Sequence, residues 1–213
     1  MITLTAITDP IKLEEYFRFR YRIYSESRQV GFVATKGDGR DVDVFDERAL
    51  HFGWYMNDTL AGCIRFVEPD ESEDALPMLS YMNESGPSNA VKQFIAMRRR
   101  QGEPVVEASR FCLAPQHRGL RTAKEFVLAM LRAVHPFGIE HGLFDCDVKH
   151  APFYRALGFE LLEGAERWQV PFLDYPTAAL HYDLRRMIVS HPSLLAGQGV
   201  PQQALQDGGK KAA

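Results

Sequence analysis

VVEASRFCLAPQHRGLRTAKEFVLAML, at residues 105–131, combines the signals of a strand, a turn and a helix. Its start, which contains Val and Phe, favours a strand over residues 104–114. A turn that ends at Gly119 follows, and apolar residues then recur at helical spacing over residues 122–135. We therefore predict a strand that leads through a tight turn into an amphipathic helix.

The start of this predicted helix is a candidate anion site. A helix N-terminus has unpaired N–H groups and the positive end of the helix dipole. Gly119 allows a ligand to approach the backbone closely, and Arg118 and Arg121 add positive charge. The pyrophosphate of coenzyme A or the phosphate of a phosphopantetheine arm would fit there. Taken alone, the same turn suits an ordinary connection equally well.

The rest of the chain predicts a single-domain α/β fold, in which helices cover both faces of one curved mixed sheet. Further helices are predicted at residues 10–27, 90–101 and 151–157, and further strands at residues 50–56, 59–67, 142–148, 159–162, 168–172 and 178–184. A polar, glycine-bearing segment at residues 31–46 indicates an ordered or closing loop. We expect the domain to span residues 1–190 and the small, polar tail at residues 191–213 to be disordered.

Composition narrows the class of protein. The net charge of −3 provides no strong cationic field, so we expect no nucleic-acid partner. Cys63, Cys112 and Cys146 form no CxxC pair, which argues against a disulfide framework or a metal site and suits a reducing compartment. Because the sequence has no signal-peptide pattern and no apolar run long enough to span a membrane, we expect a cytoplasmic protein.

Two short motifs resemble the acetyltransferase superfamily, whose fold is known as GNAT. Residues 116–121, QHRGLR, resemble its pyrophosphate loop, although Arg121 stands where that superfamily has a small residue. Residues 153–160, FYRALGFE, resemble its helix-to-strand segment. The resemblance implies a GNAT-like acyltransferase fold in which Tyr154 lies near the departing sulfur, unless Tyr154 is a packing aromatic. The donor-binding residues would be Leu113, Gln116, Arg118, Gly119 and Arg121.

A second set of motifs resembles a narrower group, the acyl-homoserine-lactone synthases and the related long-chain N-acyl amino acid synthases. The blocks are Arg20-x-x-x-Tyr24, Asp43-x-x-Asp46, Gly62-Cys63-Ile64-Arg65, Leu76-Pro77-Met78-Leu79 and Glu107-Ala108-Ser109-Arg110-Phe111. The resemblance covers residues 15–185. Lactone synthases usually carry a tryptophan near the position of Phe32 and tend to lack both acetyltransferase motifs. The chain therefore resembles the N-acyl amino acid synthase branch more closely.

This resemblance implies a long acyl chain delivered as an acyl carrier protein phosphopantetheine thioester or as acyl-CoA. It also implies a free amino acid as acceptor, with no permanently bound cofactor. Three alternatives stay open at this point. They are an acyl-homoserine-lactone synthase that uses S-adenosylmethionine, a short-chain acetyltransferase, and a non-catalytic sensor of acyl thioesters.

Glu107 is the candidate general base, because the attacking amine must lose protons and a nearby carboxylate can accept one. A salt bridge to an arginine is the alternative role. Strand alternation places Ser109, a second candidate catalytic residue, on the face of Glu107 and Arg110 on the other face. The arginines and aspartates of the motif blocks could form a charge network that braces the fold or positions the substrate. These substrate-positioning candidates are Arg20, Asp43, Asp46, Arg65 and Arg110.

A long acyl chain needs an apolar tunnel, and an acidic carrier protein needs a basic docking surface. The candidate tunnel residues, each of which also suits an ordinary core, are Phe111, Phe126, Met130, Phe144 and Phe159. The candidate docking residues are the run Arg98-Arg99-Arg100 and the pair of Arg118 and Arg121, although such charges also suit a solvated face.

Overall fold

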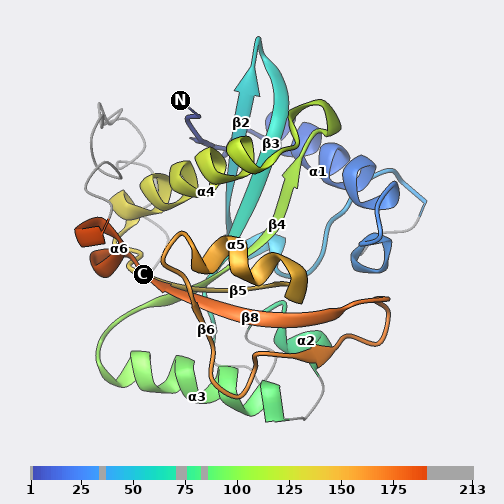
Figure 1. Cartoon of the computed structure of the whole chain (residues 1–213). Coiled ribbons are helices and arrows are strands. Elements are labelled where there is room, and N and C mark those ends of the chain that lie inside the picture. The colour runs from blue at the N-terminus through green and yellow to red at the C-terminus, as the bar shows by residue number, and fades with distance from the viewer. Residues whose placement is uncertain (1, 34–36, 71–75, 83–85, 191–213) are drawn as a thin grey trace, which may run out of the picture.

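The sheet is the organising element of the computed structural model, which describes residues 2–33, 37–70, 76–82 and 86–190. These residues contain an eight-stranded sheet in the order β1-β2-β3-β4-β5-β8-β6, with β7 paired to β8 (Figure 1). β4 and β5 run parallel, and the other paired strands are antiparallel. The strands are β1 (Thr5–Ala6), β2 (Ala49–Met56), β3 (Thr59–Val67), β4 (Val105–Leu113), β5 (His141–Asp147), β6 (Glu160–Leu161), β7 (Trp168–Gln169) and β8 (Pro176–Asp183).

Helices pack on both faces of the sheet (Figure 1). Val106 of β4 belongs to the core beneath α4 and α6, whereas its neighbour Val105 belongs to the core beneath α2 and α3. Cys112 packs in a third cluster beneath α1. The helices are α1 (Pro10–Ser25), α2 (Leu79–Met82), α3 (Gly86–Arg100), α4 (Leu120–Val134), α5 (Ala151–Arg155) and α6 (Leu184–Ser190). Short 3-10 turns lie at η1 (Val30–Phe32), η2 (Asp46–Arg48), η3 (Pro115–His117), η4 (His135–Phe137) and η5 (Val148–His150).

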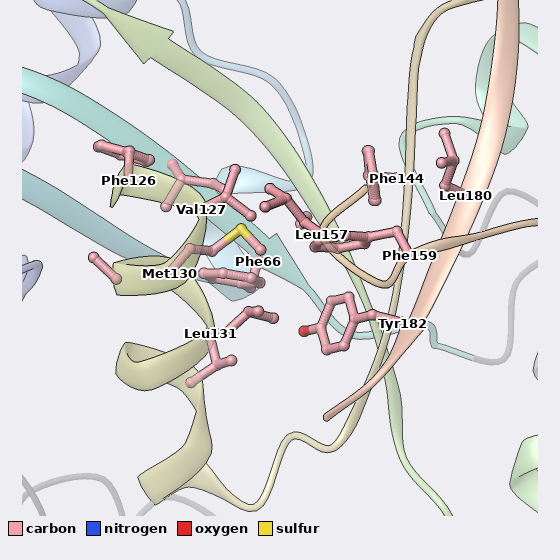
Figure 2. Packing of buried hydrophobic residues seen from close by; sticks show 14 of the residues in the cluster. Phe66, Phe126, Val127, Met130, Leu131, Phe144, Leu157, Phe159, Leu180 and Tyr182 are labelled. Atoms are coloured by element: carbon pink, nitrogen blue, oxygen red, sulfur yellow. The ribbon is translucent and has the colours of Figure 1, made fainter. Parts of the chain in front are cut away.

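α4 is held to the sheet by its apolar face. Phe126, Val127, Met130 and Leu131 recur at helical spacing and are buried. In Figure 2 they lie against strand residues such as Phe66 and close one side of the core. This packing fixes the position of the N-terminus of α4.

The two central strands separate after a short stretch of pairing. Residues 105–107 of β4 pair with residues 141–143 of β5, and both strands continue beyond that point. β4 remains paired with β3, while β5 remains paired with β8. A gap therefore opens in the middle of the sheet, where β4 and β5 diverge in Figure 1.

The helices and strands predicted from periodicity are present, with ends that differ by a few residues. The predicted strands at residues 159–162 and 168–172 are wrong in length, because β6 and β7 each pair only two residues with β8. β1, α2 and α6 were not predicted, since each is short or follows another element without a break.

The predicted loop at residues 31–46 is described except for residues 34–36. It is anchored to α1 by a hydrogen bond from the backbone N–H of Asp41 to the carbonyl oxygen of Phe17, at 3.2 Å. The tail at residues 191–213, predicted to be disordered, lies outside the described residues.

Candidate active site

β4 contains a β-bulge where it meets the gap. Ser109 pairs with Arg65 and Cys112 with Cys63, so two residues of β4 lie opposite one residue of β3. Arg110 is the first of these two residues and has a φ of 57°. The extra residue reverses the alternation of side chains, so Arg110 lies on the same side as Ser109. The prediction that Arg110 faces the other way was wrong for this reason.

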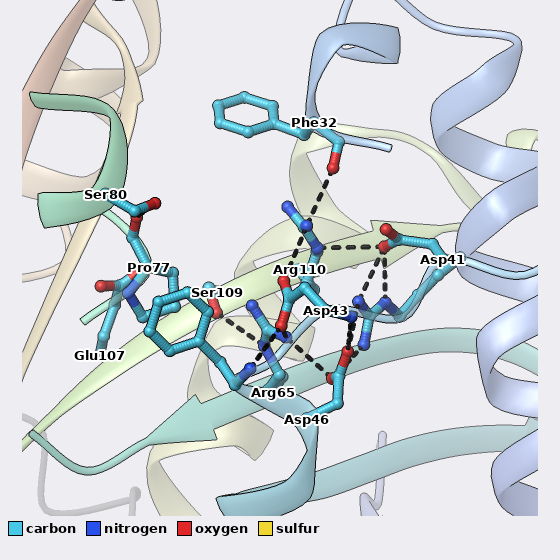
Figure 3. A network of polar contacts seen from close by, with 12 residues as sticks. Phe32, Asp41, Asp43, Asp46, Arg65, Pro77, Ser80, Glu107, Ser109 and Arg110 are labelled. Carbon is cyan, nitrogen blue, oxygen red and sulfur yellow. Dashed lines mark hydrogen bonds and ion pairs between the residues drawn. The ribbon is translucent and has the colours of Figure 1, made fainter. Parts of the chain in front are cut away.

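Three arginines and three aspartates form a closed ring of ion pairs behind the bulge (Figure 3). Each arginine contacts two aspartates, and each aspartate contacts two arginines. The pairs are Arg20–Asp41 at 2.8 Å, Arg20–Asp46 at 2.7 Å, Arg65–Asp43 at 2.6 Å, Arg65–Asp46 at 2.8 Å, Arg110–Asp41 at 3.0 Å and Arg110–Asp43 at 3.1 Å. The ring joins α1, the segment at residues 41–43, η2, β3 and β4.

The ring is buried and internally neutral. Arg20, Arg65 and Asp41 have no exposed surface, which is tolerable because every charge has partners of opposite sign. Burial by itself would raise the pKa of Asp46, but the adjacent Arg20 and Arg65 guanidinium groups outweigh it and hold that pKa well below its ordinary value.

Asp41 is the member of the ring that the sequence analysis missed. The alternation of Asp41, Val42 and Asp43 was the available signal, because residues two apart in an extended segment point in the same direction. The predicted network of Arg20, Asp43, Asp46 and Arg65 is otherwise brought together, with Arg110 as its third arginine.

A cavity of about 550 Å³ lies at the gap between β4 and β5. Its wall includes Glu107 and Ser109 from one face of the sheet and Met130 and Phe144 from the other. The cavity therefore passes through the sheet. Of the predicted tunnel residues, Phe111, Met130, Phe144 and Phe159 line it. Phe126 stacks on Phe111 instead, with the ring centroids 4.8 Å apart.

Glu107 is fully buried on this wall. Its Oε2 accepts a hydrogen bond from the backbone N–H of Met78 at 3.0 Å, and its Oε1 has no hydrogen-bond partner among the described residues. Burial, together with the Asp145 carboxyl, raises the pKa of Glu107 to about 8. Within the described part of the chain, Glu107 forms no ion pair with an arginine, and Figure 3 shows it beside Pro77 and outside the ring.

Ser109 links this wall to the ring. Its hydroxyl oxygen accepts a hydrogen bond from Nε of Arg65 at 3.2 Å. Arg110 also lines the cavity, and it donates a hydrogen bond to the carbonyl oxygen of Phe32 at 2.9 Å. The ring therefore reaches the cavity through Ser109 and Arg110.

Asp145 and Tyr81 are further polar residues of the wall, and the sequence analysis missed both. The phenol of Tyr81 donates a hydrogen bond to Oδ1 of Asp145 at 2.9 Å. Burial raises the pKa of Asp145 to about 6. The available signal was a carboxyl in the middle of the predicted apolar strand at residues 142–148.

The predicted donor residues are only partly brought together. Leu113, Arg118 and Gly119 line the cavity, whereas Gln116 and Arg121 do not. Arg121 is 93% exposed and pairs with Glu125 at 3.2 Å. Gly119 has a φ of 155°, and a Cβ there would meet no atom within 4 Å, so the backbone is open at the start of α4.

Tyr154 lies on the cavity wall and packs against Phe144, with the ring centroids 4.6 Å apart. Burial raises the pKa of its phenol well above the ordinary value, so the hydroxyl is a proton donor at neutral pH. Tyr154 therefore packs in the core and also lines the cavity, while its position near a departing sulfur stays a prediction.

The two predicted basic surfaces differ in position. Arg98, Arg99 and Arg100 lie at the end of α3 and do not line the cavity. Arg98 pairs with Glu103 at 2.6 Å, and Arg99 donates to the carbonyl oxygen of Asp70 at 3.2 Å. Arg118, in contrast, is on the cavity wall.

Two features of other classes of protein are absent from the described residues. No group of three or more His, Cys, Asp or Glu side chains there could hold a metal ion. Within the same residues, no helix is both long and apolar enough to cross a membrane.

Residues 15–183 match the family described as N-acyl amino acid synthase FeeM. Similar solved structures include FeeM, an N-acyl amino acid synthase from uncultured soil microbes, with 17% identity, coverage of 89% of this chain and 94% of that chain, and a TM-score of 0.60. The CoA-dependent acyl-homoserine lactone synthase BjaI with MTA has 21% identity, coverage of 91% and 90%, and a TM-score of 0.65. An N-acetyltransferase from Staphylococcus aureus Mu50 has 16% identity, coverage of 87% and 99%, and a TM-score of 0.52. None of the curated protein sequences matches the chain.

These similarities confirm the predicted fold class, a mixed α/β fold of the GNAT type shared with autoinducer synthases. The fold and the family together define an N-acyltransferase. More narrowly, the chain belongs to the FeeM family of N-acyl amino acid synthases.

Proposed function

We propose that the protein transfers a long-chain acyl group from an acyl carrier protein thioester, or from acyl-CoA, to the amino group of a free amino acid. The observation that carries this proposal is Glu107, a buried carboxyl with one unpartnered oxygen on the wall of a cavity that passes through the sheet. A base in that position can serve an amine, while the aromatic part of the wall can hold an acyl chain.

The donor enters, in this proposal, from the N-terminus of α4. No described side chain caps this helix, so its first N–H groups remain available to a phosphate. Arg118 adds a positive charge on the cavity wall. Beyond Glu107, the edge of β4 that faces the gap pairs with no strand among the described residues, so its backbone groups can hydrogen-bond the pantetheine arm.

The nitrogen of the acceptor must lose two protons, and the departing sulfur must gain one. The nitrogen of the acceptor attacks the thioester carbonyl carbon, so that a C–N bond forms as the C–S bond breaks. Glu107 accepts one proton from the incoming ammonium, directly or through a water molecule. The phenol of Tyr154 supplies a proton to the departing thiolate and is reprotonated by the second proton that leaves the nitrogen.

The ring of ion pairs supports this site from behind. Arg65 orients the hydroxyl of Ser109, and Arg110 holds the segment at Phe32 against the cavity. We propose that Ser109 and Arg110 contact the substrates, whereas Arg20, Asp43, Asp46 and Arg65 position those two residues. Bracing and substrate positioning are then one function of the same network.

The experiment that tests the proposal measures thiol release from a long-chain acyl carrier protein thioester and from the matching acyl-CoA. Each of the twenty amino acids and S-adenosylmethionine is offered separately, and the products are identified by mass. Amino acid-dependent release with an N-acyl amino acid product would support the proposal. Release only with S-adenosylmethionine would indicate a lactone synthase, and no release with any acceptor would indicate a sensor of thioesters.

A further inference from the structure

Glu107 and Asp145 lie on the same face of the sheet, on the two strands that border the gap. Glu107 is paired in register with Leu143, and Asp145 is two residues further along β5. Residues two apart in a strand point to the same face, so Asp145 shares the face of Leu143. Both carboxyls line the cavity, and Asp145 is close enough to raise the pKa of Glu107.

Each carboxyl is fixed by one donor. Oε2 of Glu107 accepts from the backbone of Met78, and Oδ1 of Asp145 accepts from the phenol of Tyr81. Oε1 of Glu107 is buried, and the described residues offer it no donor. A buried polar atom without a partner costs free energy, so the site is built to receive a donor from a ligand.

The nearest cations cannot neutralise these two carboxyls fully. Arg65 and Arg110 lower the pKa of Glu107, but both are held in ion pairs with the aspartates of the ring. The ring is balanced, with three arginines and three aspartates. A positive charge brought by the ligand would complete the site.

We infer that Glu107 and Asp145 together form the binding site for the ammonium group of the acceptor. This inference rests on the proposed function and adds Asp145 to it. Asp145 binds the ammonium, and Glu107 removes one proton from it, after which the neutral amine attacks the thioester. Tyr81 is a positioning residue that fixes the Asp145 carboxylate. The acceptor class is therefore a small primary amine that enters as a cation, rather than an alcohol or an amide.

The test compares Asp145→Asn with the wild type for two ligands, an amino acid and its 2-hydroxy acid analogue, which has the same shape but no ammonium. With the amino acid that the wild type uses best, the variant should show a KM for the amine raised at least about tenfold, as for the loss of one charge-assisted hydrogen bond. The KM for the acyl thioester should stay unchanged. The inhibition constant of the 2-hydroxy acid should rise by a smaller factor, because its neutral hydroxyl donates a weaker hydrogen bond to Asp145 than an ammonium group does.

Two further variants separate charge from folding. Tyr81→Phe keeps both carboxyls and removes only the hydrogen bond to Asp145, so it should raise the KM for the amine by a smaller factor. Asp183→Asn removes one negative charge from β8 at a position outside the cavity wall, and it should leave both KM values unchanged. An unchanged KM for the amine in Asp145→Asn would overturn the inference. Equal weakening of the amino acid and the 2-hydroxy acid would also overturn it, because it would indicate a structural role.

Binding measured without turnover distinguishes this inference from the proposed function. The thermal shift of each protein is recorded with the twenty amino acids and their 2-hydroxy analogues. If the wild type releases no thiol but is stabilised by an amino acid, and Asp145→Asn is not, the ammonium site stands and the transfer reaction fails. If the wild type neither transfers to an amino acid nor binds one better than its 2-hydroxy analogue, the inference fails as well.

Discussion

Glu107 combines two conflicting requirements in one side chain. Burial on the cavity wall favours its neutral form, and proton transfer requires its ionised form. The conflict is useful, since a base is most effective when its pKa lies near the working pH. The backbone N–H of Met78 and the nearby Arg65 and Arg110 keep the ionised form accessible, because all three lower the pKa.

Glu107→Gln should lower kcat by about a hundredfold, because it removes the base and preserves the shape of the side chain. The same change should also alter the free energy of unfolding, by an amount that depends on pH. The pKa of Glu107 is raised on folding, so its contribution to stability is present at low pH and is lost as the pH rises towards about 8. The Tm of the variant relative to the wild type should therefore increase over that range. Near-normal turnover would remove Glu107 from the mechanism.

The pH profile of kcat/KM should reflect the ionisation of Glu107. Only ionised Glu107 can accept a proton, so the activity should rise with pH and level off above a pKa near 8. In Asp145→Asn the neighbouring negative charge is lost. The pKa of Glu107 should therefore fall, and the rise of kcat/KM should occur at lower pH. Asp183→Asn serves as the control, and its profile should match that of the wild type. If the rising part of the pH profile stays at the same pH in Asp145→Asn, the charge of Asp145 does not influence the pKa of Glu107.

At the scale of elements, the ring of ion pairs holds α1 and the segment at residues 37–45 to the strands of the site. Asp41→Asn should destabilise the fold by about 3 kcal/mol, because it leaves buried Arg20 and Arg110 with one negative charge fewer. For a chain of this size, the Tm should fall by roughly 6–12 °C. Asp38→Asn is the matched control, since its pair with Arg40 is partly exposed. Equal Tm values for the two variants would show that the ring carries no stability.

Elements whose signal is local were predictable from the sequence. The apolar period of α4 and the apolar run of β3 extend over many residues, and each of these signals lies within the element that it predicts. The bulge in β4 was not predictable, because Arg110 adopts a positive φ without being glycine. It is fixed by ion pairs with Asp41 and Asp43, which come from a distant part of the chain.

The candidate site was predictable where a motif named its residue, as for Glu107 and Ser109. Asp145 depends instead on the register of β4 against β5 and on the phenol of Tyr81. Both are properties of the assembled sheet. Sequence spacing alone cannot bring residues 81, 107 and 145 to one wall.

At the scale of the whole molecule, the cavity joins the two faces of the sheet, so the two substrates can enter from different sides. The start of α4 borders the cavity, while the basic run at the end of α3 does not. A carrier protein must deliver its flexible arm into the gap, and its docking surface has to lie near that entrance. For the proposed carrier protein, we therefore predict a docking surface at Arg118 and Arg121 rather than at Arg98–Arg100.

Charge reversal distinguishes these two surfaces. Arg121→Glu should raise the KM for the acyl carrier protein thioester by roughly threefold or more, because it opposes an acidic partner at the entrance. The KM for the matching acyl pantetheine, which lacks the protein, should change little. Arg100→Glu is the matched control, as it makes the same charge change at an exposed position on α3. The difference between the two variants should shrink as salt is added, because exposed charges are screened. If Arg100→Glu has the larger effect, the carrier docks on α3 and its arm must reach the cavity by another route.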